Sequence, residues 1–232
     1  MKNRLLCVAM AALCAVGMIS CGNPAEPEII TITPDNAYEY IASLGSYEGL
    51  TVSAEKLSVT DSLIEDYAQY YYAELAKGTK GLTDSSGDPV PMTDAAIKKL
   101  NSEVYGTVSE YMVFIRDTVE AYVDYDYDEQ IAEAATKEAS SNSEFKEFPE
   151  GLLLNGRKQV EALYNGIAES YGVELEYYLE LCGTTEDELA IGLIEHDLTV
   201  NAIAADLGLS GDADSIEAQV SEYLLSVTNV EN

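Results

Sequence analysis

Apolar residues recur at helical spacing through much of the chain, most regularly between residues 144 and 209. The first helix predicted in this stretch begins at Pro149, because proline at a first helical position loses no hydrogen bond. Its apolar stripe consists of Val160, Leu163, Tyr164, Ile167 and Tyr171. Gly172 ends this helix, since glycine readily adopts the left-handed backbone of a C-terminal cap.

Two more helices are predicted in the same stretch. A short one covers about Leu175–Cys182 and ends at Gly183. The next begins at Thr185, which forms a Thr-x-x-Glu capping box with Glu188. Its stripe consists of Leu189, Leu193, Val200, Ile203 and Leu207, and Gly208 closes it.

The same reasoning predicts four further helices. Thr60 caps a helix that ends near Lys77, and Thr93 caps a shorter one that ends near Leu100. Thr107 and Glu110 form a second capping box, which opens a helix that continues toward Lys137. A last helix is marked by Ile216, Val220, Tyr223, Leu224 and Val227.

The β-structure predicted for the chain is limited to one hairpin near the N-terminus. Residues 40–44 and 50–59 are the two candidate strands, and residues 46–49 are the turn between them. Two strands alone are marginally stable, so the hairpin is expected to pack on helices.

Several motifs in the helical stretch occur in an order that resembles a known family. They are Glu147-Phe148-Pro149-Glu150-Gly151-Leu152, Ser170-Tyr171-Gly172, Tyr178-Leu179 and Gly183-Thr184-Thr185-Glu186-Asp187-Glu188-Leu189. Each motif is ordinary helix punctuation, but their order and spacing resemble the C-terminal chaperone domain of bacterial trigger factor. Residues 44–50, Leu-Gly-Ser-Tyr-Glu-Gly-Leu, resemble the segment that enters the isomerase domain of that family.

The resemblance implies a mainly α protein, a multi-helix body of the trigger factor C-terminal or SurA-like type with a short N-terminal β-hairpin. This body is expected over residues 37–232. In trigger factor an isomerase domain is inserted near the position of residues 78–92, a segment rich in glycine, serine and proline that is too short to hold such a domain. The resemblance therefore implies loss of the isomerase module, and no counterpart of the ribosome-binding module is found.

The N-terminus reads as a targeting segment. Lys2 and Arg4 precede an apolar run from Leu5 to Ile19, which is shorter than the roughly 20 residues that span a bilayer. The run ends in Met18-Ile19-Ser20-Cys21-Gly22, which resembles a bacterial lipoprotein signal. We therefore expect a signal peptide at residues 1–20, a lipidated Cys21 and a tether over residues 21–36. The alternative is an ordinary secretory signal with an incidental cysteine.

The composition of the chain limits its expected partners, mainly through its negative charge. The chain has 232 residues, and its 47% hydrophobic content is sufficient for a packed core. With 42 acidic and 12 basic residues, the formal charge is −30. Such a field repels phosphate backbones and anionic headgroups, so nucleic-acid binding is not expected, and membrane association is expected through the lipid anchor alone.

Candidate catalytic or metal chemistry is sparse. Asp124-Tyr125-Asp126-Tyr127-Asp128 begins like a calcium loop but lacks the glycine and the final glutamate of an EF-hand. His196 is the only histidine, so no multi-histidine metal site can form. Cys182 with His196 would be the one nucleophile–base pair, but a small buried cysteine is the simpler interpretation. We expect no catalytic residue, metal or cofactor.

A binding function follows from the resemblance. It implies a membrane-tethered, extracytoplasmic holdase or folding helper for unfolded or exported polypeptides. Two alternatives are an adaptor or structural lipoprotein with one dedicated partner, and a degenerate peptidyl-prolyl isomerase. In the helix that Thr60 caps, Tyr67 and Tyr71 share the face of Leu63 and Leu75 and should pack inward, and Ile64, Ala68 and Tyr72 broaden this face. Tyr70 should point away from it. The predicted client contacts are Tyr70 and Tyr72.

Overall fold

The structure is a computed structural model that describes residues 27–231. Its contacts divide the chain into two units, which are described separately below. Unit 1 contains the residues up to Leu50 and Ala135–Thr228, and unit 2 contains Thr51–Ala134 with the residues from Asn229 onward. The described residues form eight helices and four short strands, so the mainly α prediction is confirmed.

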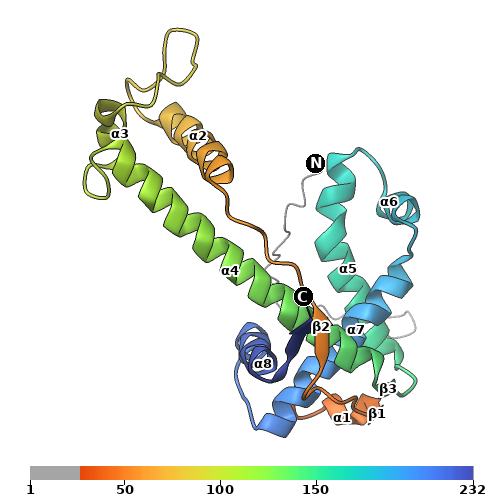
Figure 1. Ribbon diagram of the computed structural model, residues 1–232. Coiled ribbons are helices and arrows are strands. Elements are labelled where there is room, and N and C mark those ends of the chain that lie inside the picture. Colours follow the sequence, from red (N-terminus) through yellow and green to blue (C-terminus); the bar gives the residue numbers. More distant parts are fainter. Residues whose placement is uncertain (1–26, 232) are drawn as a thin grey trace. The chain divides into compact units, whose positions relative to one another are not determined.

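Unit 2 is built around helices α2 (Asp61–Gly78), α3 (Asp94–Asn101) and the first part of α4 (Val108–Ser141) (Figure 1). Their N-termini are those that the sequence predicts. The Thr60 and Thr93 hydroxyl oxygens each accept a backbone N–H bond at 3.2 Å. Glu110 and Thr107 form the predicted capping box, so local capping chemistry fixes where each helix starts.

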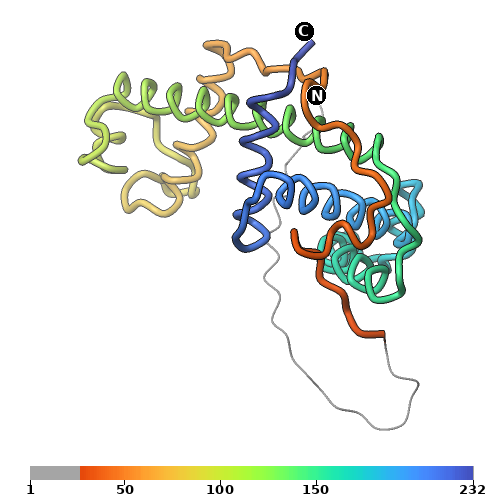
Figure 2. Tube along the Cα trace, turned by 90° about the horizontal axis from the view of Figure 1, so that it is seen from below, coloured from red at the N-terminus to blue at the C-terminus, as the bar shows by residue number. Residues whose placement is uncertain are grey.

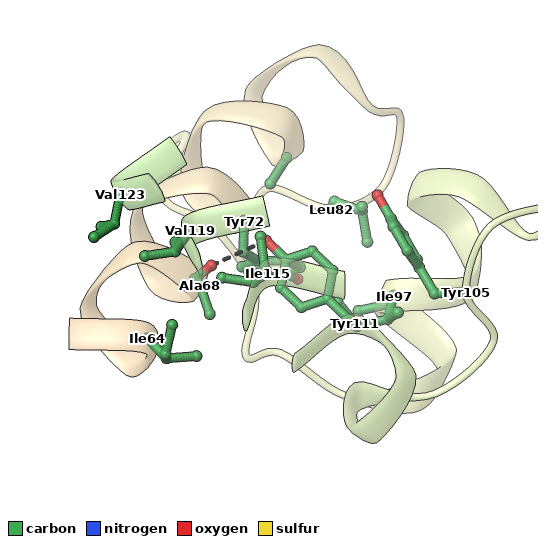
Figure 3. Packing of buried hydrophobic residues seen from close by; sticks show 12 residues of the cluster. Ile64, Ala68, Tyr72, Leu82, Ile97, Tyr105, Tyr111, Ile115, Val119 and Val123 are labelled. Atoms are coloured by element: carbon green, nitrogen blue, oxygen red, sulfur yellow. Dashed lines mark hydrogen bonds between the residues drawn. The ribbon is translucent and has the colours of Figure 1, made fainter. Parts of the chain in front are cut away.

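The core of unit 2 lies where α2, α3 and α4 face one another (Figure 3). It includes Ile64, Ala68, Tyr72, Leu82, Ile97, Tyr111, Ile115, Val119 and Val123. The Tyr111 hydroxyl donates to the Ala68 carbonyl oxygen at 3.1 Å, which joins α4 to α2 inside the core. Between α2 and α3 the predicted loop is present, and Thr83 and Pro89 form an isolated β-bridge within it.

Unit 1 contains helices α5 (Glu150–Ser170), α6 (Leu175–Cys182), α7 (Glu186–Leu207) and α8 (Ala213–Val227). All four match predicted helices. Gly183 and Gly208 close α6 and α7 with φ values of 77° and 66°, in the left-handed region that favours glycine. Thr185 and Glu188 form the complete capping box of α7.

Helices α5 and α7 pack closely because a glycine lies between them. A Cβ atom on Gly156 would be 2.9 Å from the Ala190 carbonyl oxygen and 3.0 Å from Ile194 Cδ1. A side chain at this position would therefore push the two helices apart. The resulting core continues through Leu152, Leu198 and Ala202, and a short helix, α1 (Ala37–Tyr40), packs on α7.

The predicted hairpin is wrong. Strands β1 (Ile41–Ser43) and β2 (Thr51–Ser53) exist, but they do not pair with each other. β1 pairs antiparallel with β3 (Glu144–Phe145) in unit 1, and β2 pairs parallel with β4 (Asn229–Glu231) in unit 2 (Figures 1 and 2). The apolar pattern marks extended segments, but it does not specify which distant segment completes the ladder.

The predicted tether ends earlier than expected. The Ile30 N–H donates to the Gly151 carbonyl oxygen at 3.2 Å, and Asn155 Nδ2 donates to the Ile30 carbonyl oxygen at 3.0 Å. Ile30 and Ile32 also pack against the core of unit 1. Residues 30–36 are therefore part of the folded body, because their isoleucines bury apolar surface against α5.

The predicted signal peptide and Cys21 lie outside the described residues. Among the helices of residues 27–231, none combines the length and the hydropathy needed to cross a membrane.

Candidate functional site

Two exposed aromatic surfaces are the features of this chain best suited to binding another molecule. The first, the α2 aromatic face, consists of Tyr67, Tyr70 and Tyr71 in unit 2. Tyr70 is 63% exposed and Tyr71 is 42% exposed. The Tyr71 ring stacks on Tyr67 with a centroid distance of 6.1 Å and meets Tyr70 edge-on at 5.7 Å. These contacts hold a continuous aromatic surface in place.

The orientation of α2 differs from the prediction by about one residue. The buried stripe is Ile64, Ala68, Tyr72 and Ala76 rather than the stripe that contains Tyr71. Tyr72 is 2% exposed and lies within the core in Figure 3, so its predicted contact with a client is wrong. Tyr71, expected inside, is exposed. Both stripes are apolar at the same spacing, and the smaller Ala68 and Ala76 allow the closer approach of α4.

Tyr70 is exposed, as predicted. Its role in contacting a client remains a prediction. Because Tyr70 and Tyr71 lie together on the surface, a ligand that covers one ring can also cover the other.

The second surface, the α5–α6 aromatic end, belongs to unit 1. Tyr171 is 73% exposed, Tyr177 is 53% exposed and Leu181 is 67% exposed. Tyr171 and Tyr178 stack with a centroid distance of 6.0 Å. Tyr178 also packs against a small core formed by Val160, Leu179 and Ala190.

Sequence reasoning missed this second surface because it placed Tyr171 on the buried stripe of α5. The helix ends at Ser170, and Gly172 turns the chain with a φ of 70°, so the Tyr171 ring leaves the stripe. The adjacent stop signal, which was recognised, could have indicated this change of direction. A ring at a helix C-terminus does not follow the helical period.

The α5–α6 aromatic end belongs to an acidic part of the sequence. From Gln159 to Asn232 the sequence contains 16 acidic residues and no lysine or arginine. Partial burial and the nearby Glu161 carboxylate raise the pKa of Glu186, and Arg157 only partly offsets the effect. This surface therefore combines exposed rings with a negative field, which favours ligands that are both apolar and basic.

The structure gives the positions of the residues that the sequence offered for metal binding or catalysis. Residues 124–128 lie in the middle of α4, where a helix cannot form the turn of a calcium loop. His196 is 38% exposed and approaches the Glu217 carboxylate at 3.7 Å. Cys182 is exposed at the end of α6, so the expected burial of this cysteine is wrong. Among residues 27–231, no group of three or more His, Cys, Asp and Glu side chains is placed to hold a metal ion.

Comparison with known proteins supports the resemblance. The chain is 27% identical over 195 residues to trigger factor from Streptococcus agalactiae serotype Ia, an alignment that covers 81% of this chain and 44% of that protein. It is 25% identical over 192 residues to trigger factor from Streptococcus uberis, covering 78% of this chain and 45% of the relative. The chain is therefore similar to trigger factor over most of its length. It spans less than half the length of these curated relatives. No protein-family model matches it.

The alignment with trigger factor is longer than the stretch that carries most of the motifs. It extends over most of the chain rather than over the Glu147–Leu189 stretch alone. An alignment of this length includes the residues of both exposed aromatic surfaces.

Proposed function

We propose that this chain is a chaperone-like protein that binds unfolded or exported polypeptides, tethered to the extracytoplasmic face of a bacterial membrane by a lipid on Cys21. The proposal for binding is supported by the two exposed aromatic surfaces on a trigger-factor-like body. The proposal for the anchor is supported by the sequence before Gly22, which has the order of a lipoprotein signal.

Exposed rings suit a ligand that has no fixed sequence. Covering apolar surface contributes about 25 cal/mol per Å², whatever the order of the covered side chains. Association itself costs several kcal/mol, so one small aromatic surface supports only weak binding. A client that contacts both surfaces at once would be bound more tightly than by either surface alone. Weak and broad contacts of this kind are what a holdase needs.

The negative charge of the chain favours some unfolded clients over others. The formal charge of −30 would keep a complex with an apolar client in solution. The same charge would favour clients that carry lysine or arginine near their apolar segments.

Suppression of client aggregation tests the proposal. The purified chain, in stoichiometric excess, should delay the aggregation of a chemically unfolded protein. Tyr70→Ala and Tyr171→Ala should each weaken this activity while leaving circular dichroism unchanged, since both rings are exposed. Tyr122→Ala is the matched control, because Tyr122 is 50% exposed but belongs to neither aromatic surface.

Failure of the wild-type chain to delay aggregation at any excess would refute the chaperone-like function. If the wild-type chain is active and all three variants match it, the client binds elsewhere. Capture of one partner at equal stoichiometry, in place of many partners at low occupancy, would favour the adaptor alternative.

A further inference from the structure

A hollow of about 510 Å³ lies in unit 1 beside the C-terminal part of α7. Its wall consists of Tyr38 from α1, Asp206 from α7, and the loop after β1, which contributes residues 44–46, Tyr47 and Glu48. We call it the tyrosine–carboxylate hollow. α1 packs directly on α7 (Figure 1), so the two sides of the hollow belong to one packed unit.

Asp206 holds both aromatic walls. The Tyr38 hydroxyl donates to Asp206 Oδ1 at 2.7 Å, and the Tyr47 hydroxyl donates to Asp206 Oδ2 at 3.2 Å. Burial and the nearby Asp206 carboxylate raise the pKa of Tyr47 to about 12, so this hydroxyl stays protonated and remains a donor at neutral pH. An ionised carboxylate offers about four acceptor positions, so two tyrosine hydroxyls leave Asp206 able to accept further bonds.

Glu48 is fixed in a similar way. The Tyr223 hydroxyl from α8 donates to Glu48 Oε1 at 2.5 Å, and the Tyr223 ring meets Tyr47 edge-on at a centroid distance of 6.3 Å. Three tyrosines therefore orient two carboxylates. Within residues 27–231, neither Glu48 nor Asp206 has a Lys, Arg or His partner among the ion pairs, whereas Asp187 and Asp61 are each paired with an arginine.

The loop that carries Tyr47 and Glu48 is held against the end of α4. The Gly45 N–H donates to Ser143 Oγ at 2.8 Å. A Cβ atom on Gly45 would be 2.4 Å from the Ala139 carbonyl oxygen, so only glycine permits this approach. The hollow is thus formed before any ligand arrives, which lowers the cost of ordering a bound group.

We propose that the tyrosine–carboxylate hollow is a subsite for a positively charged side chain, the guanidinium of arginine or the ammonium of lysine, on a bound polypeptide. The assignment rests on the proposed client-binding function. A cation between these walls would pair with Asp206 and Glu48 and lie near the electron-rich faces of Tyr38 and Tyr47. Both carboxylates are exposed, so a neutral group would gain no charge attraction from them, and the acidic sequence from Gln159 onward repels anions.

Titration with blocked amino acids tests the subsite directly. N-acetyl-arginine amide and its neutral isostere N-acetyl-citrulline amide are added to the full chain that carries isotope-labelled tyrosine rings. The arginine derivative should cause saturable shifts of the Tyr38 and Tyr47 ring signals, assigned through Tyr→Phe variants, and the citrulline derivative should cause none. Equal responses to both compounds, or no saturable response to arginine, would overturn the assignment.

Matched variants locate the effect. Asp206→Asn should weaken arginine binding about fivefold or more, because it removes a charge and loosens both aromatic walls. Glu222→Gln makes the same change of charge on the exposed surface of α8, outside the hollow, and should leave binding unchanged. Equal weakening by both variants would mean that the overall negative field, and not the hollow, attracts the cation.

A pair of apolar peptides separates this inference from the proposed function. The peptides differ only in one arginine or citrulline. The wild-type chain should bind the arginine peptide more tightly, and Asp206→Asn should abolish the difference. Equal binding of both peptides by the wild-type chain would overturn the subsite and leave the chaperone-like function standing. Binding of neither peptide, together with no delay of aggregation, would refute the chaperone-like function, and with it the client role of the hollow.

Discussion

The buried hydroxyl of Tyr72 gives a sharp test of the packing in unit 2. The Tyr72 side chain is 2% exposed, and no group among the described residues forms a hydrogen bond with its hydroxyl. Tyr111 is also buried, but its hydroxyl donates to the Ala68 carbonyl oxygen at 3.1 Å (Figure 3). Replacing either tyrosine by phenylalanine removes one hydroxyl group from the core of unit 2, with a hydrogen bond lost only at Tyr111.

The two variants should change stability in opposite directions. A buried polar group without a partner costs about 1–3 kcal/mol, so Tyr72→Phe should raise the free energy of unfolding by about 1 kcal/mol or more. Tyr111→Phe removes a made hydrogen bond and should lower it by about 1 kcal/mol. Tyr70→Phe is the control, because Tyr70 is exposed and should change stability by less than about 0.5 kcal/mol.

Urea unfolding followed by circular dichroism measures these differences. At a slope of about 2 kcal/mol per M, a separation of about 2 kcal/mol moves the two midpoints about 1 M apart. The slope must stay the same in all variants for the comparison to hold. Destabilisation by Tyr72→Phe would refute the reasoning, since it would mean that the hydroxyl makes a favourable bond in solution.

Three further predictions follow from other parts of the chain. Gly156→Ala should destabilise unit 1 by about 1–3 kcal/mol, because the added methyl would meet the Ala190 carbonyl oxygen and Ile194. Thermal unfolding measures this loss, and an unchanged melting temperature would contradict the close packing of α5 and α7. Burial raises the pKa of Tyr111 from 10.0 to about 12, so this hydroxyl ionises at a lower pH in the unfolded chain than in the folded chain. The free energy of unfolding should therefore fall as the pH rises from about 10 to 12. Tyr111→Phe should reduce this loss, which alkaline unfolding curves measure. Cys21→Ala should release the protein from membranes in cell fractionation, because stable anchoring requires the acyl chains on that cysteine, and unchanged fractionation would exclude the lipid anchor.

Helix boundaries were predictable because their signals are local. A threonine hydroxyl caps a helix by accepting a hydrogen bond from a backbone N–H within the next three residues. A glycine ends a helix because its own backbone readily adopts the left-handed conformation. The starts at Thr60, Thr93 and Thr185 were therefore found from sequence, as were the stops at Gly183 and Gly208.

Helix orientation was less predictable because it depends on the partner. In α2 the residues on either side of the true buried stripe are also apolar or aromatic, so the period alone cannot distinguish Tyr71 from Tyr72. Packing on α4 decides between them. In the observed orientation the Tyr111 hydroxyl donates to the Ala68 carbonyl oxygen at 3.1 Å. A pattern of hydrophobic positions predicts that a face is buried, but a neighbouring helix determines which residues it contains.

The tyrosine–carboxylate hollow lies beyond sequence reasoning for a related reason. Tyr38 and Asp206 are separated by 168 positions, and Glu48 and Tyr223 by 175. Nothing near either carboxylate in the sequence marks it as a binding group, because acidic residues occur throughout the chain. What distinguishes Asp206 and Glu48 is that folding surrounds them with tyrosines and leaves them without a basic partner among the described residues. In a chain this acidic, the informative carboxylates are those that the fold orients by hydrogen bonds and leaves uncompensated, since a bound cation gains most there.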